Sequence, residues 1–452
     1  MTLLLVNARL GEVDTCVRID GHRITEIGPG LRPSRGDDVL DGRGGWLSPG
    51  LHDHHVHLLA LAAAEGSIQV GPPVVNDRAQ LERATRRAVT SAPSSWVRGV
   101  GYHESVAGDL TAAMLDEWAP TTPVRIQHRS GAMWILNSEA LRRTGLTDVA
   151  DGRLLRGDDR IAAVAPDVPL DLAAVGRRAA GWGVTGFTDA DPVRSPEQVD
   201  LLRLGVRQRL HLMGQPDLML DADERVTLGP VKVLLDDDRL PTIDELTDLV
   251  TDAHQRGRAV AVHCVTRVQL VVALAAFARA GTGIGDRVEH GSLIPIELVP
   301  EIGRLGLAVC TQPNFVAERG DAYLADLDAD DRRDLYRCGS LIDGGVTVAL
   351  GTDAPFGAPN PWALIAAARD RTTRTGHAIG PAERIDAHDA LRRFTLDPID
   401  LALPRGLAVG QPADLAVLPA PLDDLVATPD EARTTWTIAG GTVIGGEDFT
   451  HD

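Results

Sequence analysis

The chain has 452 residues, of which 44% are hydrophobic and 24% charged, and its formal net charge is −19. These values are typical of a soluble globular protein that is long enough for one large domain and a smaller one. The negative charge argues against nucleic acid and membrane as partners, because nucleic acid and anionic lipid both demand a basic face. The four cysteines lack CxxC spacing, so we predict neither a disulfide framework nor a zinc finger and expect a reducing compartment.

The first ten residues, MTLLLVNARL, contain a short apolar run without a basic region or a small-residue cleavage site. We interpret this run as a first strand and not as a signal peptide. No segment reaches the ~18 consecutive apolar residues of a membrane span. The stretch LVVALAAFARA is interrupted by Arg279 and predicts a buried helix. The sequence therefore predicts a cytoplasmic protein.

The pattern of predicted elements changes twice along the chain. Residues 1–50 are short alternating segments, among which Asp20-Gly21 predicts a hairpin turn. From residue 51 to about 398, apolar strands alternate with helices, which is typical of parallel βα units. Residues 399–452 return to short strands. We therefore predict an α/β protein: a (β/α)8 TIM-type barrel over 51–398, with an insertion at about 100–150, and a small β-sandwich domain built from 1–50 and 399–452.

Several predicted strands end in residues that bind metals. In LHDHHVHL, His55 and His57 are two residues apart, so both imidazoles lie on one face of a strand. Such a pair alone is weak evidence for a metal site. However, His263 ends AVAVH, His290 ends RVEH and Asp353 ends VALGTD, each after an apolar run. A single histidine of this kind is more often a core residue, so the argument depends on their spacing.

The spacing of these residues matches a barrel, which uses roughly 31 residues per βα unit. Lys232, His263 and His290 are 31 and 27 residues apart, one unit each, and Asp353 follows after 63, two units. If Asp353 ends strand eight, the others end strands four, five and six, and the His55 pair ends strand one. All of these side chains then converge at the C-terminal mouth, where barrel active sites lie.

Lys232 is unusual in its residue type. Of the 45 Lys and Arg residues it is the one lysine, which leaves 44 arginines, and it lies in the apolar strand PVKVLLD. A buried amine near cations loses its proton more readily and can add carbon dioxide to form a carbamate, which arginine cannot do. That carbamate is an anionic oxygen ligand able to bridge two metals. The alternative is a lysine in a salt bridge with a strand-end residue such as Asp236.

At this point the sequence resembles the amidohydrolase superfamily of metal-dependent hydrolases. The segment LSPGLHDHHVHL is similar to its first-strand motif, and VKVLLD, AVAVH, RVEHGSL and LGTDAPF follow in the expected order. The stretch from Val100 to Leu141 further resembles amidohydrolase family 3, the branch containing N-substituted formamide deformylase. Within it, Ala132 stands where that branch commonly has a histidine, so the deformylase substrate is not carried across.

The resemblance implies a binuclear site and a role for each ligand. It implies that two divalent ions bind to His55, His57, Lys232, His263, His290 and Asp353. Zinc is the expected metal, and manganese and iron are alternatives, because imidazole and carboxylate ligands suit several ions. The resemblance further implies that Lys232 bridges the two ions as a carbamate and that a hydroxide between them attacks the substrate. Asp353 would act as general base and then acid, and His290 belongs to the same catalytic group. His52 and His54 point away from the pair by parity, and we interpret them as structural.

The function expected from this resemblance is hydrolysis of a C–N bond, in an amide, an N-formyl group or a cyclic amide, of a small molecule. Esters, lactones or phosphotriesters are alternative substrates, and a weakly catalytic regulatory protein is a further alternative. The sequence leaves a homodimer open. Candidate substrate contacts, each as readily explained by packing, are Tyr102, His103, His128, Trp134, Gln312, Phe315, Arg319 and Phe356.

Overall fold

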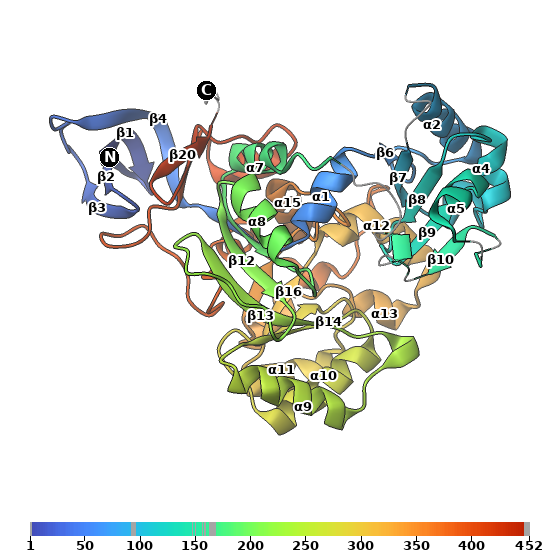
Figure 1. Cartoon of the computed structure of the whole chain (residues 1–452). Coiled ribbons are helices and arrows are strands. Elements are labelled where there is room, and N and C mark those ends of the chain that lie inside the picture. Colours follow the sequence, from blue (N-terminus) through green and yellow to red (C-terminus); the bar gives the residue numbers. More distant parts are fainter. Residues whose placement is uncertain are drawn as a thin grey trace. The chain divides into compact units, whose positions relative to one another are not determined.

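The computed structural model describes residues 2–91, 96–146, 148–149, 151–155, 157, 160–161 and 169–446. The chain divides into two compact units. The first unit comprises Met1–Leu58 together with Leu172–Asp452, and the second is Leu59–Asp171 (Figure 1). The segment predicted as an insertion lies within the second unit.

The first unit contains an eight-stranded parallel sheet that follows the predicted barrel order. Its strands, in sequence order, are β5 (Leu51–Val56), β11 (Val184–Asp189), β12 (Arg209–Gly214), β13 (Val226–Leu234), β14 (Val260–Cys264), β15 (Arg287–His290), β16 (Ala308–Thr311) and β17 (Val348–Leu350). The first and last strands meet just beyond the ladder, where the Asp353 amide donates to His55 O at 2.8 Å. The fold class is therefore confirmed, and β5, β13, β14, β15 and β17 are strands one, four, five, six and eight.

Helices follow the strands and cover the outside of this sheet (Figure 1). The main helices are α7 (Leu172–Gly181), α8 (Pro196–Gly205), α9 (Ile243–Gln255), α10 (Arg267–Ala280), α11 (Val299–Leu305), α12 (Asn314–Asp326), α13 (Ala329–Asp334), α14 (Gly339–Asp343), α15 (Pro361–Asp370) and α16 (Ala387–Arg393). Val231, Val262 and Val288 on the strands pack with Leu246 of α9 and Leu270 of α10 in one buried cluster. This burial of apolar side chains holds the strands in register and fixes the positions of the residues at their ends.

The two chain ends form a seven-stranded mixed sheet, which is the small β domain. Its spatial order is β20 (Thr442–Gly445), β19 (Trp436–Ala439), β18 (Leu415–Leu418), β4 (Asp37–Pro49), β1 (Thr2–Leu10), β2 (Val13–Asp20) and β3 (Arg23–Gly28). The predicted hairpin between β2 and β3 is confirmed, with Gly21 at a φ of 55° that favours glycine. α17 (Leu422–Ala427) lies between β18 and β19.

The second unit is a five-stranded sheet with its own apolar core. After α1 (Leu58–Glu65), its elements are β6 (Ile68–Gln69), α2 (Arg78–Ser91), β7 (Val97–Tyr102), α3 (Glu104–Ala107), α4 (Ala112–Trp118), β8 (Val124–His128), β9 (Met133–Leu136), α5 (Ser138–Thr144) and β10 (Arg153–Leu155). Leu81, Leu115, Val124 and Ile126 are completely buried in this core. The unit is therefore a folded element and not an extended loop.

Local sequence signals account for several element boundaries. A capping box opens α9, because Thr242 accepts from the Glu245 amide while Glu245 accepts from the Thr242 amide. Gly257 follows the helix at a φ of 70°. The barrel strand β12 has the weakest sequence signal, because RLHLMG offers only a short apolar alternation.

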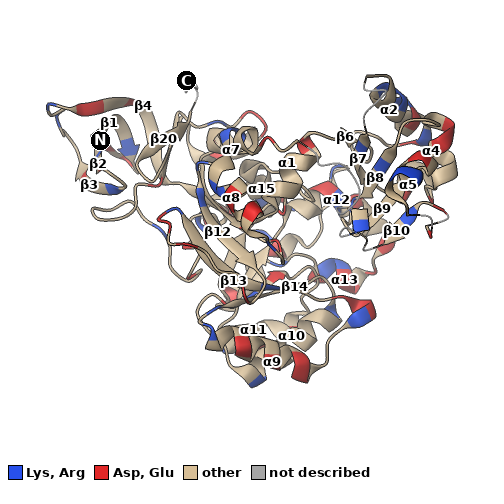
Figure 2. Ribbon diagram, viewed as in Figure 1, with Lys and Arg blue, Asp and Glu red and all other residues tan. Residues whose placement is uncertain are grey.

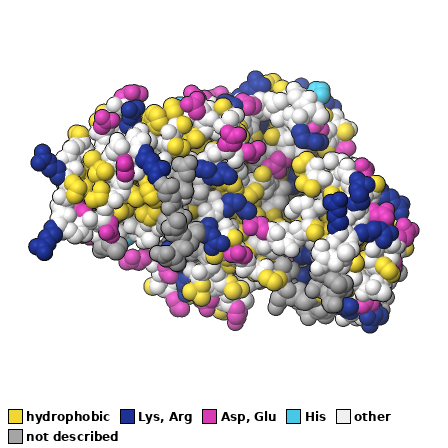
Figure 3. Space-filling view, turned by 90° about the horizontal axis from the view of Figure 1, so that it is seen from above, with side chains coloured by type: hydrophobic (Ala, Val, Ile, Leu, Met, Phe, Trp, Pro, Cys, Tyr) yellow, Lys and Arg dark blue, Asp and Glu magenta, His cyan; other side chains and the backbone are white. Residues whose placement is uncertain are grey.

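Charged side chains lie on helices and loops of both units (Figure 2). On the face shown in Figure 3, acidic and basic side chains are interspersed. Within the part of the chain that the structure describes, no helix combines the length and apolar character needed to cross a membrane.

Candidate active site

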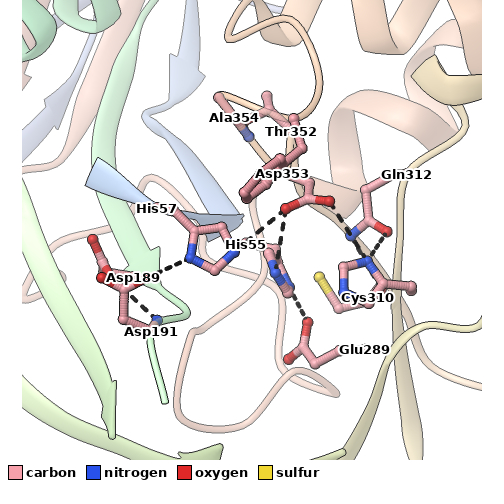
Figure 4. A network of polar contacts seen from close by, with 12 residues as sticks. His55, His57, Asp189, Asp191, Glu289, Cys310, Gln312, Thr352, Asp353 and Ala354 are labelled. Carbon is pink, nitrogen blue, oxygen red and sulfur yellow. Dashed lines mark hydrogen bonds and ion pairs between the residues drawn. The ribbon is translucent and has the colours of Figure 1, made fainter. Parts of the chain in front are cut away.

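The two histidines of the first strand converge on the aspartate that follows the eighth (Figure 4). His55 Nε2 lies 3.7 Å and His57 Nε2 lies 3.5 Å from the same atom, Asp353 Oδ1. His55 is completely buried, and Asp353 is 6% exposed. The predicted i, i+2 geometry of the histidine pair is therefore present, and it faces one carboxylate oxygen.

The loop after β17 is held tightly against β5, and this contact fixes Asp353. A Cβ at Gly351 would lie 2.5 Å from the His55 amide nitrogen, so this close approach requires glycine. Asp53 accepts from the Thr352 amide at 2.9 Å and from its hydroxyl at 2.5 Å. Asp353 itself has a φ of 54°, a conformation that non-glycine residues adopt mainly where surrounding contacts impose it.

Each histidine of the pair also contacts a second carboxylate through its other ring nitrogen (Figure 4). His57 Nδ1 donates to Asp191 Oδ1 at 2.5 Å, and His55 Nδ1 donates to Glu289 Oε2. Glu289 is completely buried, whereas the side chain of Asp191 is 25% exposed. The Nε2 atoms of both rings are therefore directed toward Asp353.

Two further histidines lie at the ends of the neighbouring strands. The ring centroids of His263 and His290 are 4.5 Å apart, and those of His55 and His290 are 4.7 Å apart. His290 Nδ1 contacts Gln312 Oε1 at 2.9 Å and lies 3.8 Å from Asp353 Oδ2. His55, His57, His263, His290 and Asp353, all predicted from sequence, are thus brought together at the carboxyl ends of the strands.

Lys232 points into the same interior from β13. It is 6% exposed, and its Nζ atom has no hydrogen-bond partner among the described residues. The salt-bridge alternative involving Asp236 is not observed in that part of the chain. Burial lowers the pKa of the Lys232 ammonium from its ordinary value, although Glu289 and Asp353 act in the opposite direction.

The charges of this cluster shift the pKa values of its members in opposite directions. Burial alone would lower the pKa of His57, but hydrogen bonds to Asp191 and Asp353 raise it to about 10. Burial would raise the pKa of Asp353, but the hydrogen bond from His57 and the neighbouring imidazoles hold it well below its usual range. Burial lowers the pKa of His263 to about 3. Asp353 is therefore ionised and His263 neutral at physiological pH.

The donor set fits a metal ion. His55 Nε2, His57 Nε2 and Asp353 Oδ1 lie close enough together to ligate one ion, and imidazole with carboxylate is the ligand chemistry of zinc. His55 Nε2 and Lys232 Nζ are buried atoms without hydrogen-bond partners among the described residues. Such atoms are costly unless another group satisfies them. A second possible group consists of His55, Glu289 and Cys310.

Three of the predicted substrate residues lie beside this cluster in the first unit. The Phe356 ring meets His57 edge to face, at a centroid distance of 5.5 Å. Arg319 lies over the Phe315 ring at 4.2 Å and donates to Phe356 O at 2.5 Å. Phe315 is only 3% exposed, which favours the packing alternative for it. Arg319 forms no salt bridge to Asp321 or Glu318 within the described residues.

Gln312, a fourth predicted substrate residue of the first unit, contacts His290, and the remaining predicted substrate residues belong to the second unit. Tyr102 is 1% exposed and its hydroxyl donates to Gly108 O at 2.6 Å, while Trp134 is 6% exposed. These positions favour the packing alternative for both residues. His128 contacts Glu104 Oε2 at 3.1 Å, and His103 lies 3.7 Å from the same atom. The structure thus joins two of the predicted histidines into a cluster around Glu104.

His52 and His54 are buried apart from the His55 pair. His52 contacts Thr188 Oγ1 at 2.8 Å, and its ring lies 4.8 Å from that of His54. Burial lowers the pKa of both imidazoles well below the ordinary value. Gly186 makes room for His52, since a Cβ there would lie 2.4 Å from His52 Nδ1.

Sequence reasoning missed Glu289, Asp191 and Cys310. The sequence signal that identifies Glu289 is its spacing from Arg287. Two charged residues at i, i+2 inside a fully buried strand must be paired within the interior. Adjacent strand residues ordinarily point to opposite faces. Here Glu289 and His290 both reach the cluster, and His290 has a φ of 68°. Pattern alone does not predict that backbone conformation.

A (β/α)8 barrel that gathers imidazoles and carboxylates at the carboxyl ends of its strands is the architecture of a metal-dependent barrel enzyme. The chain belongs to the amidohydrolase family, whose sequence model matches residues 38–447. It is therefore a hydrolase.

Individual relatives agree with this assignment. The chain is 25% identical over 506 aligned residues to N-substituted formamide deformylase of Arthrobacter pascens, covering 92% of this chain and 93% of that protein. Its fold is similar to that of an uncharacterized metal-dependent hydrolase from Pyrococcus horikoshii, at 18% identity and a TM-score of 0.74, covering 96% of this chain and 100% of the other. It is also similar to atrazine chlorohydrolase TrzN from Arthrobacter aurescens TC1 complexed with zinc, at 14% identity and a TM-score of 0.56, covering 98% and 95%. At these identities the solved structures show the fold alone.

Proposed function

We propose that this protein hydrolyses a C–N bond of a small molecule, in an amide, an N-formyl group or a cyclic amide. The observation that carries the proposal is the convergence of His55 Nε2 and His57 Nε2 on Asp353 Oδ1, close to the unpartnered amine of Lys232. The similarity to N-substituted formamide deformylase over most of both chains supports this bond type.

Two divalent ions, most simply Zn²⁺, are the proposed cofactors. His55, His57 and Asp353 would hold one ion, His263 and His290 the other, and Lys232 would contact both. Addition of carbon dioxide to the neutral Lys232 amine forms an N–C bond and releases a proton, giving an anionic carbamate. When bound, the metal pair would supply Lewis-acid polarisation of the carbonyl group and would lower the pKa of the attacking water.

Asp353 is the proposed proton carrier. Its low pKa keeps it ionised, so Oδ2 can accept a proton from the attacking water. It can then return this proton to the leaving nitrogen, which departs as a neutral amine. His290, at 3.8 Å from Oδ2, and the His55 pair on Oδ1 keep the carboxylate in one orientation. Gln312 fixes the His290 ring through Nδ1.

The proposed substrate pocket lies beside His57. Phe356 presents an apolar surface there, and the Arg319 guanidinium lies over Phe315 next to it. An apolar or aromatic group on the substrate would pack against Phe356, and Arg319 would pair with a substrate carboxylate. Because both residues belong to the first unit, this part of the specificity belongs to the barrel itself.

A substrate panel tests the proposed function. The zinc-loaded protein is assayed on N-formyl, N-acyl and cyclic amides beside matched aryl esters, lactones and phosphotriesters. We expect the highest kcat/KM among the amides. Faster turnover of the esters, lactones or phosphotriesters would replace the proposed bond type. Equal inactivity on every substrate, with metal bound, would favour a regulatory metal-binding protein instead.

Metal content tests the cofactor separately. After reconstitution with zinc and bicarbonate, elemental analysis should return two metals per chain. A single metal would contradict the binuclear site and leave His55, His57 and Asp353 as the ligands of a mononuclear one.

A further inference from the structure

The two histidines of the pair share an arrangement that reaches beyond their own strand. In each ring, Nδ1 faces one carboxylate while Nε2 faces Asp353 (Figure 4). The two Nδ1 partners come from different barrel strands: Glu289 lies on β15, and Asp191 follows β11. Spacing along β5 sets which face the imidazoles occupy, but it leaves rotation about χ2 broad. The carboxylates of Glu289 and Asp191 restrict this rotation of the two imidazole rings.

We propose that Glu289 and Asp191 are the positioning residues of the metal centre, which hold His55 and His57 in the orientation and tautomer that present Nε2 to the metal. This inference rests on the proposed function, because it concerns the same site. An ionised carboxylate can accept a hydrogen bond but cannot donate one, so its partner nitrogen must carry the hydrogen. When a metal binds, each ring therefore keeps its hydrogen on Nδ1 and offers the lone pair of Nε2.

An arginine lies beside each of the two carboxylates: Arg287 makes a hydrogen bond to Glu289, and Arg194 forms a longer ion pair with Asp191. Arg287 Nε donates to Glu289 Oε1 at 2.5 Å, which leaves Oε2 for His55. Arg194 Nη1 lies 3.9 Å from Asp191 Oδ2, on the opposite side from the oxygen that binds His57. Arg194 is anchored by Asp189 and by Met213 O, the latter at 2.6 Å. Each histidine is therefore the last member of a series of three side chains: an arginine, a carboxylate and the imidazole.

The two arginine–carboxylate–imidazole series differ in burial, and this difference decides which carboxylate to substitute first. The side chains of Arg287 and Glu289 are at most 1% exposed, so removing one leaves a buried charge without its partner and endangers folding. The side chain of Asp191 is 25% exposed, so water can solvate the space left by a truncation. Asp191 is therefore the residue to change first, with Glu289→Gln as the second variant.

The protein also offers a matched control. The side chain of Asp223 is 24% exposed and pairs with Arg203 at 3.3 Å, but it contacts no imidazole among the described residues. Asp223→Ala therefore removes a carboxylate of equal exposure from an ion pair in the same unit. Any loss common to Asp223→Ala and Asp191→Ala reflects general destabilisation.

The experiment measures zinc affinity of the full-length protein by competition with a chromogenic chelator. Asp191→Ala should raise the zinc dissociation constant by about 10- to 100-fold, the usual effect of losing such a partner. Asp191→Asn should raise it less, because the amide oxygen still accepts from Nδ1. Asp223→Ala should leave it unchanged. Glu289→Gln, where it folds, should also weaken binding.

A spectroscopic readout separates positioning from a purely structural role. With cobalt(II) as the bound metal, the Nδ1–H protons of the coordinated imidazoles give shifted, exchangeable NMR signals. Asp191→Ala should broaden or remove the His57 signal by faster exchange with water, and Asp223→Ala should retain it. Wild-type zinc affinity and an unchanged signal in both Asp191 variants would overturn the inference while leaving the proposed function intact. A wild-type protein that binds no zinc would instead overturn the proposed function, and the inference with it.

Discussion

Two buried polar networks in the first unit differ in whether their buried nitrogen atoms have hydrogen-bond partners. In the network around Arg337, Nε donates to Ile294 O at 2.6 Å, and the two terminal nitrogens contact Asp334 at 2.6 Å and Glu383. Glu383 also accepts from the Ser340 amide at 3.0 Å. In the metal-type cluster, by contrast, Lys232 Nζ and His55 Nε2 are buried and have no hydrogen-bond partner within the described part of the chain.

The difference separates polar groups that stabilise the fold from polar groups that await a ligand. Burying an unpaired charge is costly, and each nitrogen of the Arg337 guanidinium has a hydrogen-bond partner. In the cluster at the strand ends, two of the atoms that would contact a metal, His55 Nε2 and Lys232 Nζ, have no hydrogen-bond partner among the described residues. The predictions below test whether the fold and the metal-type cluster respond separately to substitutions.

The largest effect is expected for Lys232→Arg. Guanidinium cannot be carboxylated and adds a fixed positive charge beside the proposed cations, so the second metal and most turnover should be lost. Elemental analysis and kcat measure the two losses. Lys232→Ala should also fail, but formate or acetate could enter the vacated space and restore some activity to it and not to the Arg variant. An active, fully metallated Lys232→Arg protein would contradict the carbamate bridge.

The next effect concerns Asp353→Asn. The amide keeps the shape of the side chain but cannot accept a proton, so turnover should fall by ~10² to 10⁴. Much of the metal should remain, because the imidazole ligands are unchanged, and metal content serves as the control. Near-native kcat in this variant would remove Asp353 from the proton transfer.

The Arg337 network should respond in the opposite way. Glu383→Gln leaves Arg337 with Asp334 but removes one buried charge, so the free energy of unfolding should fall by about 3 kcal/mol. Denaturant titration measures this loss, and zinc content should stay at the wild-type value. A loss of metal in this variant would mean that the two networks are coupled and would break the comparison.

The pH dependence of stability sharpens the same contrast. Burial would raise the pKa of Glu383, but hydrogen bonds from Ser340 and the charge of Arg337 hold it below its ordinary value. A carboxyl group with a lowered pKa contributes stability above its unfolded pKa and loses it as the pH falls through the folded pKa. The wild type should therefore lose free energy of unfolding below about pH 4.3, the ordinary glutamate value. Glu383→Gln should show a flatter acid limb in the same titrations.

The sequence predicted the part of the site that depends on local pattern. His55, His57, His263 and Asp353 end apolar strands, and parallel strands of a barrel present their carboxyl ends at one mouth. Lys232 could be identified as a candidate site residue because charged side chains are rare inside such apolar strands. These features follow from the two-residue period of a strand and from the spacing between successive strands, both of which can be read from a single sequence.

The remaining features depend on contacts between distant segments. Asp191 reaches His57 only because β11 pairs with β5, and Glu289 reaches the cluster beside His290 at a positive φ. Neither contact can be predicted from the local sequence pattern. Tyr102 shows the reverse case: it lies among loop-like residues in sequence, yet it is the last residue of β7 and is buried.

The smallest effect is expected at the surface, where polar groups are satisfied locally. Thr242→Ala removes the hydroxyl that accepts from the Glu245 amide at 3.2 Å at the start of α9, and such a cap is worth about 1 kcal/mol. Thr247→Ala is the matched control, because its hydroxyl only donates back to Ile243 O within the helix and alanine has the higher helix propensity. Denaturant titration should therefore show a loss for Thr242→Ala and none for Thr247→Ala, with zinc content and kcat unchanged in both. Equal stability of the two variants would show that the cap contributes nothing measurable. A drop in zinc content would instead show that α9 transmits strain to β14 and His263, and the separation between scaffold and site would fail there.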